Sequence, residues 1–430
     1  MSQQRSIEVI ADWASLGGPT LMGRLTATPA RGKEIFAFEY DAAWLASASC
    51  RQLDPALALY SGAQYPAKGR ESFGVFLDSC PDRWGRVLMR RREAQLARAE
   101  GRAERHLLES DYLLGVHDGH RMGALRFRLE GRFLDDNDEL ASPPWTSLGE
   151  LEQASLALER EGVEDEPDYE RWLRMLIAPG GSLGGARPKA SVRDEHERLW
   201  IAKFPSRNDE EDIGAWEAVV HALAELAGIV VPTAALRRFG SSKRDAHGHH
   251  TFLTRRFDRK DARERLHFAS AMTLLERMDG QGADDGASYL ELAELLIRLG
   301  SRTSADLQQL WRRVVFFICV SNTDDHLRNH GFMLEPTGWT LAPAYDMNPD
   351  PHGAGLKLNI SENDNAQDID LALSVAQVFR VKHARARDIV EEVASAVAQW
   401  RTVAKRHGLS RAAQARMRRA FRVAEAWAQA

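Results

Sequence analysis

A polar stretch between Val320 and Asp346 holds the side-chain types that phosphoryl transfer requires. Asp324 and Asn329 stand five residues apart in an Asp-x-x-x-x-Asn pattern, and Asp346 follows further along the chain. One carboxylate can orient an attacking hydroxyl, while an amide and a second carboxylate can hold magnesium against phosphate oxygens. A polar turn in which an Asp caps a helix would use the same residue types, so the stretch alone leaves both interpretations open.

The same stretch also carries the ligand types of a metal-dependent hydrolase or nuclease, in Asp324, Asp325, His326 and His330. The two histidines are four positions apart, a spacing that places them on one face of a helix. No Glu follows the first of them, as a His-Glu-x-x-His motif would require. In this interpretation the glycine-rich loop and the strand lysine described below would have no role.

Apolar periodicity predicts the elements that would position these residues. The apolar run over 310–320 predicts a helix that leads into the polar loop, and the turn over 335–338 predicts a hairpin that carries the chain to Asp346. Most of the chain after Leu266 is expected to be helical, over 269–278, 289–300 and 303–320 and in three or more helices after 368.

Two earlier signals fit the handling of phosphate. Residues 179–189 form a glycine-rich run that closes on Lys189, and glycines let backbone N–H groups approach an anion. The run matches neither the Walker A pattern nor Gly-x-Gly-x-x-Gly, and a surface turn is the alternative. Lys203 lies in a predicted strand over 199–205, where a buried ammonium is costly unless an anion meets it. An edge-strand lysine that points to solvent is the alternative, and Glu217 on the following helix is a candidate partner.

The residues before and after these signals suggest the domain organisation. We expect a small N-terminal α/β unit with strands over 21–25 and 35–40, a helix from Pro81 to about residue 104, and a hairpin over 113–127. An acidic, proline-containing stretch over 131–146 predicts a linker, which places a domain boundary near residue 147. Strands over 229–233 and 251–259 follow, and Phe257 could flank an adenine ring or pack in the core.

Composition limits the class of protein. The chain has 430 residues, which favours two domains, and 44% hydrophobic with 28% charged residues is ordinary for a globular protein. A net charge of −5 argues against an autonomous nucleic-acid coat. No apolar run reaches the roughly 20 residues of a membrane span, and the N-terminus leads into no signal-peptide core, so we expect a cytoplasmic protein without membrane contact. The three cysteines are scattered, which predicts buried thiols rather than disulfides or a zinc site.

With these residues in view, the chain resembles the HipA family of serine/threonine kinases, the toxin halves of bacterial toxin–antitoxin pairs. The resemblance extends over most of the chain, and its motifs occur in the family order. They are Ser182-Leu-Gly-Gly-Ala-Arg-Pro-Lys189, Ile201-Ala-Lys203, Arg256-Phe-Asp-Arg259, Thr323-Asp-Asp-His-Leu-Arg-Asn329 and Ala344-Tyr-Asp346.

The resemblance implies an α+β, bilobal, protein-kinase-like fold with a small N-terminal α/β subdomain and a large helical C-terminal lobe. The N-terminal subdomain would span residues 1–146 and the kinase-like domain residues 147–430. Within the latter, the ATP loop and strand lobe would occupy about 178–260, and the helical catalytic lobe about 261–430.

The resemblance also implies a role for each matching residue. Asp324 would be the catalytic Asp, Asn329 and Asp346 would hold Mg²⁺, and Ser182 would be the site of an inactivating autophosphorylation. ATP would be bound by the glycine loop, the strand lysine, the hinge and the catalytic loop, through Gly184, Gly185, Ala186, Arg187, Pro188, Lys189, Lys203, Arg255, Arg256, Phe257, His326, Leu327, Arg328, Asn329, Tyr345 and Asp346.

The partners that the resemblance implies are a protein substrate, with glutamyl-tRNA synthetase as the best-known target of the family, and a HipB-like helix-turn-helix antitoxin. DNA would be contacted only indirectly, through the antitoxin complex. The sequence departs from the family pattern at two positions. Arg255 stands where the hinge commonly has Glu, and Asp325 replaces a small residue and is expected to add negative charge near the metals. A HipA-like repressor partner that no longer phosphorylates is the alternative within the family.

Overall fold

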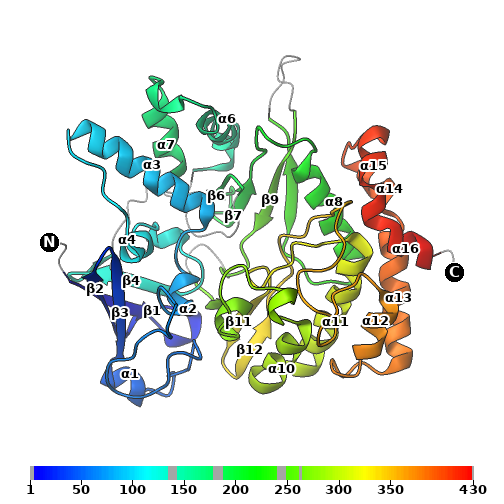
Figure 1. Ribbon diagram of the computed structural model, residues 1–430, viewed down its shortest axis with the longest axis horizontal. Helices are drawn as coiled ribbons and strands as arrows, with labels where there is room; N and C mark the ends of the chain where they lie inside the picture. Colours follow the sequence, from blue (N-terminus) through cyan, green and yellow to red (C-terminus); the bar gives the residue numbers. More distant parts are fainter. Residues whose placement is uncertain (1–3, 134–142, 178–186, 240–247, 261–263, 429–430) are drawn as a thin grey trace. The chain divides into compact units, whose positions relative to one another are not determined.

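The computed structural model describes residues 4–133, 143–177, 187–239, 248–260 and 264–428, and it shows a mixed α/β protein (Figure 1). The chain divides into two compact units. The first unit contains residues 1–208, 239–247 and 255–269, and the second contains 209–238, 248–254 and 270–430. Ser182, Gly184, Gly185 and Ala186, together with most of the expected linker, lie outside the described residues.

The first unit begins with an antiparallel sheet in the order β3-β2-β1-β4-β5. Its strands are β1 (Arg5–Ala11), β2 (Thr20–Ala30), β3 (Lys33–Tyr40), β4 (Leu125–Leu129) and β5 (Arg132–Phe133). Alternate side chains of β3 are buried, which is the pattern of a strand with one face on a core. Phe38 packs against Phe73 and Phe76, with ring centroids 6.5 and 5.4 Å away. The strands expected over 21–25 and 35–40 are therefore confirmed.

Helices and a hairpin complete the first unit. The helices are α1 (Ala42–Ala46), α2 (Gly74–Leu77), α3 (Arg83–Ala99), α4 (Glu109–Leu114), α6 (Leu148–Leu158) and α7 (Tyr169–Ile177), and α7 packs on both α3 and α6. The hairpin pairs β6 (Lys189–Arg193) with β7 (Leu199–Lys203), so that Lys189 lies opposite Lys203. The sequence thus predicted the strand that carries Lys203 correctly.

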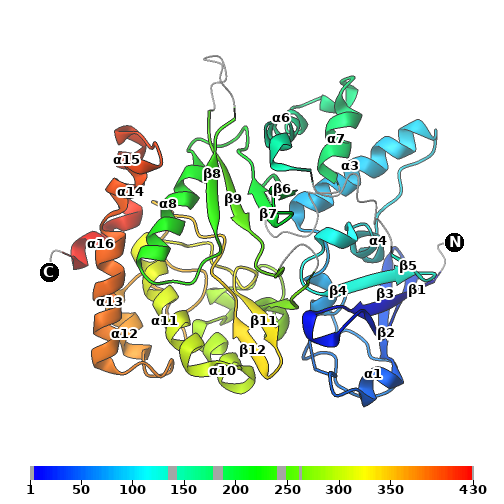
Figure 2. The ribbon, with the colours of Figure 1, turned by 180° about the vertical axis from the view of Figure 1, so that it is seen from behind.

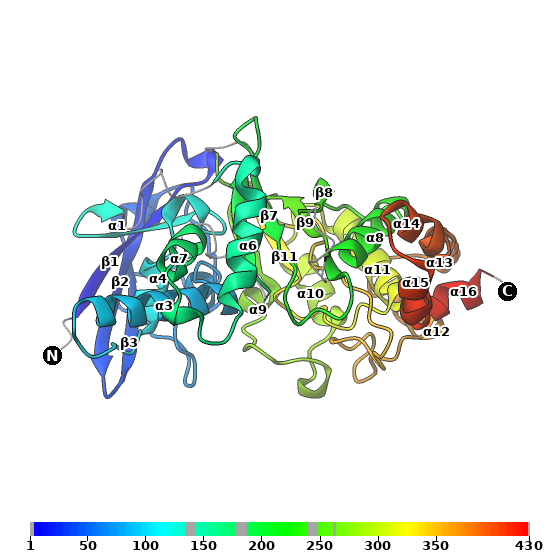
Figure 3. The same ribbon diagram turned by 90° about the horizontal axis from the view of Figure 1, so that it is seen from above.

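The second unit is mostly helical. Its central helix, α11 (Thr303–Val320), is buried from Val314 to Val320 and contacts α10 (Tyr289–Leu299), α12 (Ile369–Val375), α13 (His383–Val397) and α16 (Arg422–Trp427). Helices α13 and α14 (Trp400–Arg406) also pack along α8 (Ile213–Leu226), and Figure 3 shows this helical layer from above. Trp400 stacks on Phe421 with a centroid separation of 4.5 Å, which joins the last helices of the chain.

Two strand pairs accompany these helices. β8 (Ala234–Arg237) runs antiparallel to β9 (Thr251–Arg255), and the two strands lie side by side in Figure 2. β11 (Gly331–Glu335) and β12 (Gly338–Leu341) form the expected hairpin after the polar loop. No helix in the described part of the chain is long and apolar enough to cross a membrane.

Three local predictions were wrong. Residues 113–127 do not form a hairpin, because β4 pairs with β1 and the preceding turn is held by buried polar contacts described below. The strand expected over 229–233 begins only at Ala234, after Pro232, which has no N–H for a ladder. The helix expected over 269–278 is reduced to α9 (Ala271–Leu274), since Glu276 adopts a left-handed φ of 53°.

Candidate active site

The polar loop follows directly after the end of α11. Ser321 terminates the helix in a left-handed conformation, and the Asn322 N–H donates to the Phe317 carbonyl at 3.0 Å. The Thr323 hydroxyl donates to the Asp350 carboxylate at 2.7 Å, and the Asp350 N–H donates back to the Ser321 carbonyl at 3.0 Å. These bonds fix the start of the loop to the segment that follows Asp346.

Asp324 and Asn329 are brought together by this loop. The Asn329 side-chain amide donates to the Asp324 main-chain carbonyl at 2.9 Å, which leaves the Asn329 amide oxygen as an acceptor. Asp324 is exposed, and among the described residues its carboxylate accepts no hydrogen bond and forms no ion pair. The carboxylate can therefore accept a hydrogen bond from a hydroxyl that approaches from solvent.

Asp325 points into the protein, away from the exposed side of the loop. It is wholly buried, accepts hydrogen bonds from the Tyr289 hydroxyl and, at 3.3 Å, from the Lys357 N–H, and lies 3.5 Å from the His330 ring nitrogen. Burial raises the pKa of this carboxyl group above its ordinary value. Asp324 is thus the solvent-facing carboxylate of the pair, and the expectation that Asp325 adds negative charge near a metal stays a prediction.

Asp346 lies beyond the hairpin in a left-handed conformation, with a φ of 56°. Such a conformation is uncommon for a residue with a Cβ, although Asp tolerates it better than most. The preceding Tyr345 donates its hydroxyl to the Arg328 carbonyl at 2.6 Å, and Arg328 pairs with Asp279 at 3.0 Å. Tyr345 and Arg328 thus connect the segment of Asp346 to the loop of Asp324.

Two further residues of the loop differ in their surroundings. The Leu327 side chain is buried, and its carbonyl accepts from the Met272 N–H at 3.3 Å. His326 is half-buried, and its Nδ1 atom is buried with no hydrogen-bond partner among the described residues. A buried polar atom of this kind normally has a partner, so a bound polar molecule beside His326 would satisfy it.

In the first unit, Lys189 is already paired. It is 2% exposed, and its ammonium lies 3.0 Å from the Asp82 carboxylate, which also caps α3 by accepting from the Gly85 N–H. Burial raises the pKa of Asp82 despite the attraction of Lys189. A contact between Lys189 and a nucleotide would require this ion pair to open. Lys203, opposite it in the hairpin, is half-buried.

The neighbouring loop residues and the expected hinge are also in the first unit. Arg187 donates to the Phe204 carbonyl at 3.4 Å, and the Pro188 carbonyl accepts from the Phe204 N–H at 2.9 Å. The Arg256 guanidinium is buried against Asp258 and the His120 carbonyl, and the Arg256 N–H donates to the Leu199 carbonyl at 3.0 Å. A ligand could therefore reach this residue through its main-chain carbonyl. Arg255 and Phe257 are half-buried, and Phe257 packs on Phe268 with a centroid distance of 6.1 Å.

The donor set of the second unit fits magnesium better than a multi-histidine metal site. Carboxylate and amide oxygens, as in Asp346 and Asn329, are the ligands that Mg²⁺ prefers. Within the described residues, no group of three or more His, Cys, Asp or Glu side chains could hold a metal ion. His330 is 1% exposed and packs against Tyr289 and Phe317, which does not favour the hydrolase interpretation.

Sequence reasoning missed several residues that support this site. Asp350 lies close to Asp346 in the sequence, and its run of polar neighbours was an available signal. Tyr289 and Asp82 gave no local signal, because their partners Asp325 and Lys189 are 36 and 107 residues away. Such contacts follow from the tertiary fold.

Comparison with known proteins identifies proteins that are similar to this chain. A family model described as HipA-like C-terminal domain matches residues 181–400. A protein of Haemophilus influenzae named "Putative kinase" is 26% identical over 181 residues, covering 39% of this chain and 52% of the relative. "Putative kinase Y4mE" of Sinorhizobium fredii is 27% identical over 154 residues, covering 34% of this chain and 33% of the relative. The matched regions thus span about half and a third of the length of these two relatives.

Among solved structures, one that is similar covers nearly the whole chain. It is a Shewanella oneidensis HipA protein in complex with HipB and operator DNA, with a TM-score of 0.67, 15% identity, and coverage of 98% of this chain and 96% of that chain. At this identity the likeness concerns the fold, and it includes the residues before 181 that the family model does not reach.

Proposed function

The chain belongs to the family of HipA-like C-terminal domains, and on that premise we propose that it is an ATP- and Mg²⁺-dependent protein kinase that phosphorylates serine or threonine. The observation that carries the proposal is the pairing of Asp324 with Asn329. The Asp324 carboxylate is exposed and has no partner among the described residues, and the Asn329 amide is fixed to the main chain of the same loop at 2.9 Å. This is the arrangement that phosphoryl transfer needs at the attacking hydroxyl.

Separate residues would bind the substrate hydroxyl, the metal ion and the nucleotide. Asp324 would accept a hydrogen bond from the substrate hydroxyl and so align its oxygen for attack. The Asn329 amide oxygen and the Asp346 carboxylate would hold Mg²⁺, which when bound neutralises charge on the phosphates. Lys203 would supply further positive charge, and the main chain of residues 255–257 would receive the adenine.

We also propose the bilobal kinase arrangement, the ATP loop over Gly184 to Lys189, and autophosphorylation of Ser182, all of which the family resemblance implies. A helix-turn-helix antitoxin is the partner that this family resemblance suggests, and DNA would be reached through it. The full-length structural likeness to a HipA protein in complex with HipB and operator DNA supports this partner.

The decisive experiment incubates the purified full chain with γ-labelled ATP and Mg²⁺. We expect label on the protein, and a loss of at least about a hundredfold in Asp324→Asn, the size of effect typical of a lost general base. Asp284→Asn is a matched control, since Asp284 is also an exposed aspartate that has no partner among the described residues.

Each other outcome points elsewhere. Wild-type protein that binds ATP without transferring label would indicate a repressor partner instead of a kinase. Cleavage of nucleic acid, abolished by replacing His326 and His330, would indicate the metal-dependent hydrolase. Equal labelling of wild type and Asp324→Asn would remove Asp324 from its proposed role.

A further inference from the structure

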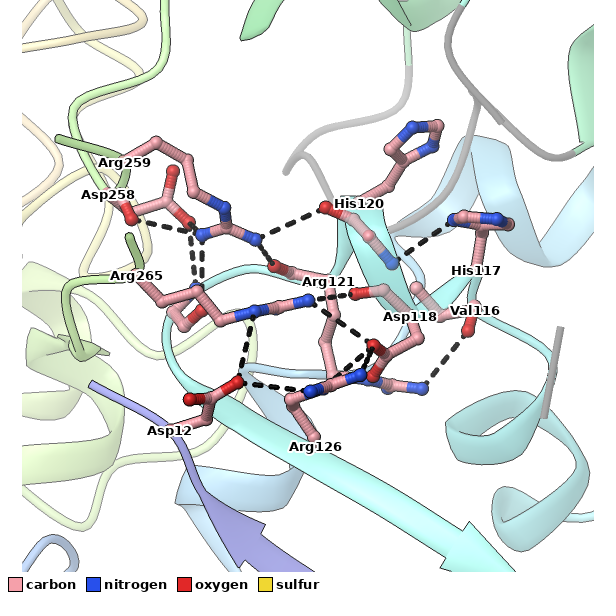
Figure 4. Close-up of polar contacts among 12 residues, drawn as sticks. Asp12, Val116, His117, Asp118, His120, Arg121, Arg126, Asp258, Arg259 and Arg265 are labelled. Carbon is pink, nitrogen blue, oxygen red and sulfur yellow. Dashed lines mark hydrogen bonds and ion pairs between the residues drawn. The ribbon is translucent and has the colours of Figure 1, made fainter. Parts of the chain in front are cut away.

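The first unit contains a dense buried cluster that the proposed chemistry does not use. Figure 4 shows Arg259 and Arg265 directed at the turn that carries Asp118, His120 and Arg121. The cluster combines five arginines with three aspartates, namely Arg121, Arg126, Arg256, Arg259, Arg265, Asp12, Asp118 and Asp258. We call it the arginine cluster. Its positive residues outnumber its negative ones, so carboxylates alone cannot satisfy the guanidinium groups.

Asp258 is the centre of the cluster. It is 0% exposed and accepts from Arg256 at 2.8 and 2.6 Å, from Arg259 at 2.6 Å and from the Gly123 N–H at 2.8 Å. These contacts hold the pKa of Asp258 far below its ordinary value, although burial opposes them. The carboxylate is therefore ionised, and it fixes the two arginines on either side of it in the sequence.

Arg256, Arg259 and Arg265 also donate to main-chain carbonyls of one turn. Arg256 donates to the His120 carbonyl at 2.6 Å, and Arg259 donates to the Arg121 carbonyl at 2.7 Å. Arg265 donates to the Asp118 carbonyl at 2.8 Å. Because a guanidinium presents its donors in a rigid planar fork, each arginine fixes both position and orientation. The segment 256–265 is thereby fastened to residues 118–123.

A glycine allows this close approach. Gly123 has a φ of +72°, and a Cβ atom at this position would lie 3.1 Å from the Phe268 nitrogen. Any other residue would be strained in this conformation and would press on the main chain that follows the cluster. The packing of the turn against the 256–268 segment is thus built into the main chain as well as the side chains.

The segment 256–265, which the arginine cluster fixes, lies next to a point where the chain passes from one unit to the other. The chain passes from the second unit into the first between residues 254 and 255 and returns between 269 and 270. The segment fixed by Asp258 therefore begins where the chain enters the first unit, at Arg255, Arg256 and Phe257. Under the proposed function these are the residues whose main chain meets the adenine.

We infer that Asp258 is a positioning residue for the nucleotide. Through Arg256, it fixes the main chain of Arg255–Phe257. The inference rests on the proposed function and adds to it a determinant of nucleotide affinity outside the ATP contacts. Because the adenine keeps the same contacts before and during transfer, loosening this segment weakens ground state and transition state equally. Such a change raises KM and leaves kcat nearly unaltered.

The test compares three full-length proteins for AMP-PNP affinity and for the kinetics of phosphate transfer. For Asp258→Asn we expect about a tenfold loss of AMP-PNP affinity, which is a usual size of effect for a residue outside the binding site. KM should rise by a similar factor, and kcat should stay within about twofold of the wild-type value. Asp12→Asn is the matched control. Asp12 belongs to the same cluster but is bonded to Arg126 at 3.1 Å and only distantly to Arg265, at 4.0 Å. We expect its affinity to change by less than about twofold.

A second variant keeps the test decisive if Asp258→Asn does not fold. Arg259→Gln leaves the Asp258–Arg256 pair intact and removes the Arg259 donors to the Asp258 carboxylate and to the Arg121, Gly119 and Gly123 carbonyls, and about a threefold loss of affinity is expected. Folded variants with wild-type affinity would overturn the inference, as would equal losses in the Asp12→Asn control. If the wild-type chain binds no AMP-PNP, the proposed function itself fails, and the inference fails with it.

Discussion

At the scale of single residues, the neighbouring carboxylates Asp324 and Asp325 have opposite environments. Asp324 faces solvent without a partner in the described structure, while Asp325 is buried among the Tyr289 hydroxyl, His330 and the Lys357 N–H. All three of these groups can donate to a carboxylate, so Asp325 holds the loop to the protein interior. The position of Asp324 and Asn329 depends on these contacts.

We therefore expect Asp325→Asn to destabilise the protein by about 1 to 3 kcal/mol, because its NH₂ group would face a donor instead of accepting from it. Phosphate transfer should also fall, through a loosened loop. Tyr289→Phe is the graded comparison, since it removes one donor and leaves the carboxylate. Urea unfolding and labelling assays measure both effects. An Asn variant as stable and active as wild type would show that Asp325 is carried as a neutral acid and that its charge has no role.

Sequence spacing can indicate a contact between residues that lie close together in the chain, while their roles here stay predictions. The Asp-x-x-x-x-Asn pattern of Asp324 and Asn329 corresponds to a real contact, in which the amide bonds to the Asp324 carbonyl. The orientation of Asp325 could not be predicted, because it depends on Tyr289, which the fold alone brings to it. The pairing of Lys189 with Asp82 is of the same kind.

At the scale of elements, the start of α8 shows how one side chain joins a helix to a strand. Asp212 caps the helix by accepting from the Ala215 N–H at 3.1 Å, and it accepts from the His250 N–H at 3.0 Å just before β9. Its carboxylate also lies 2.6 Å from the His250 ring. Although burial opposes it, the His250 hydrogen bond helps to keep the pKa of Asp212 below its ordinary value.

Replacement of Asp212 by Ala should lower the free energy of unfolding by about 2 kcal/mol, since a helix cap and a buried contact are lost together. Glu210→Ala, an exposed acidic position two residues earlier that has no partner in the described structure, should change it by less than about 0.5 kcal/mol. Equilibrium urea unfolding compares the two variants. Equal effects would mean that Asp212 acts only as one more surface charge.

Element prediction succeeded where local signals agreed and failed where polar contacts were remote. The range predicted for α11 matches the structure, Thr303–Val320, because a long apolar pattern specifies a buried helix. The turn over 116–124 was mistaken for part of a hairpin. Its conformation is set by Arg256, Arg259 and Arg265, which lie more than 130 residues later and bond to its carbonyls. No local pattern could have revealed them.

At the scale of the whole molecule, the chain forms two compact units, and the domain boundary expected near residue 147 stays a prediction. Each compact unit is assembled from separate stretches of chain, with residues 255–269 belonging to the first unit and 209–238 to the second. The residues with proposed roles are found in both units, with Lys203 in the first and Asp346 in the second. Tests of the proposed function therefore need the intact chain.

Ligand binding should be visible in the stability of that intact chain. A ligand at a hundred times its Kd stabilises the native state by about 2.7 kcal/mol, so saturating AMP-PNP with Mg²⁺ should raise Tm by several degrees. If Asn329 and Asp346 hold the metal, EDTA should remove part of this increase. Asp346→Asn should have a smaller increase that no longer responds to EDTA, and Asn tolerates the left-handed φ of 56° at this position. The Asp284→Asn control should keep the full response. Shifts of equal size with and without Mg²⁺ in the wild-type chain would mean that the metal does not bind with the nucleotide, and Asn329 and Asp346 would then need another role.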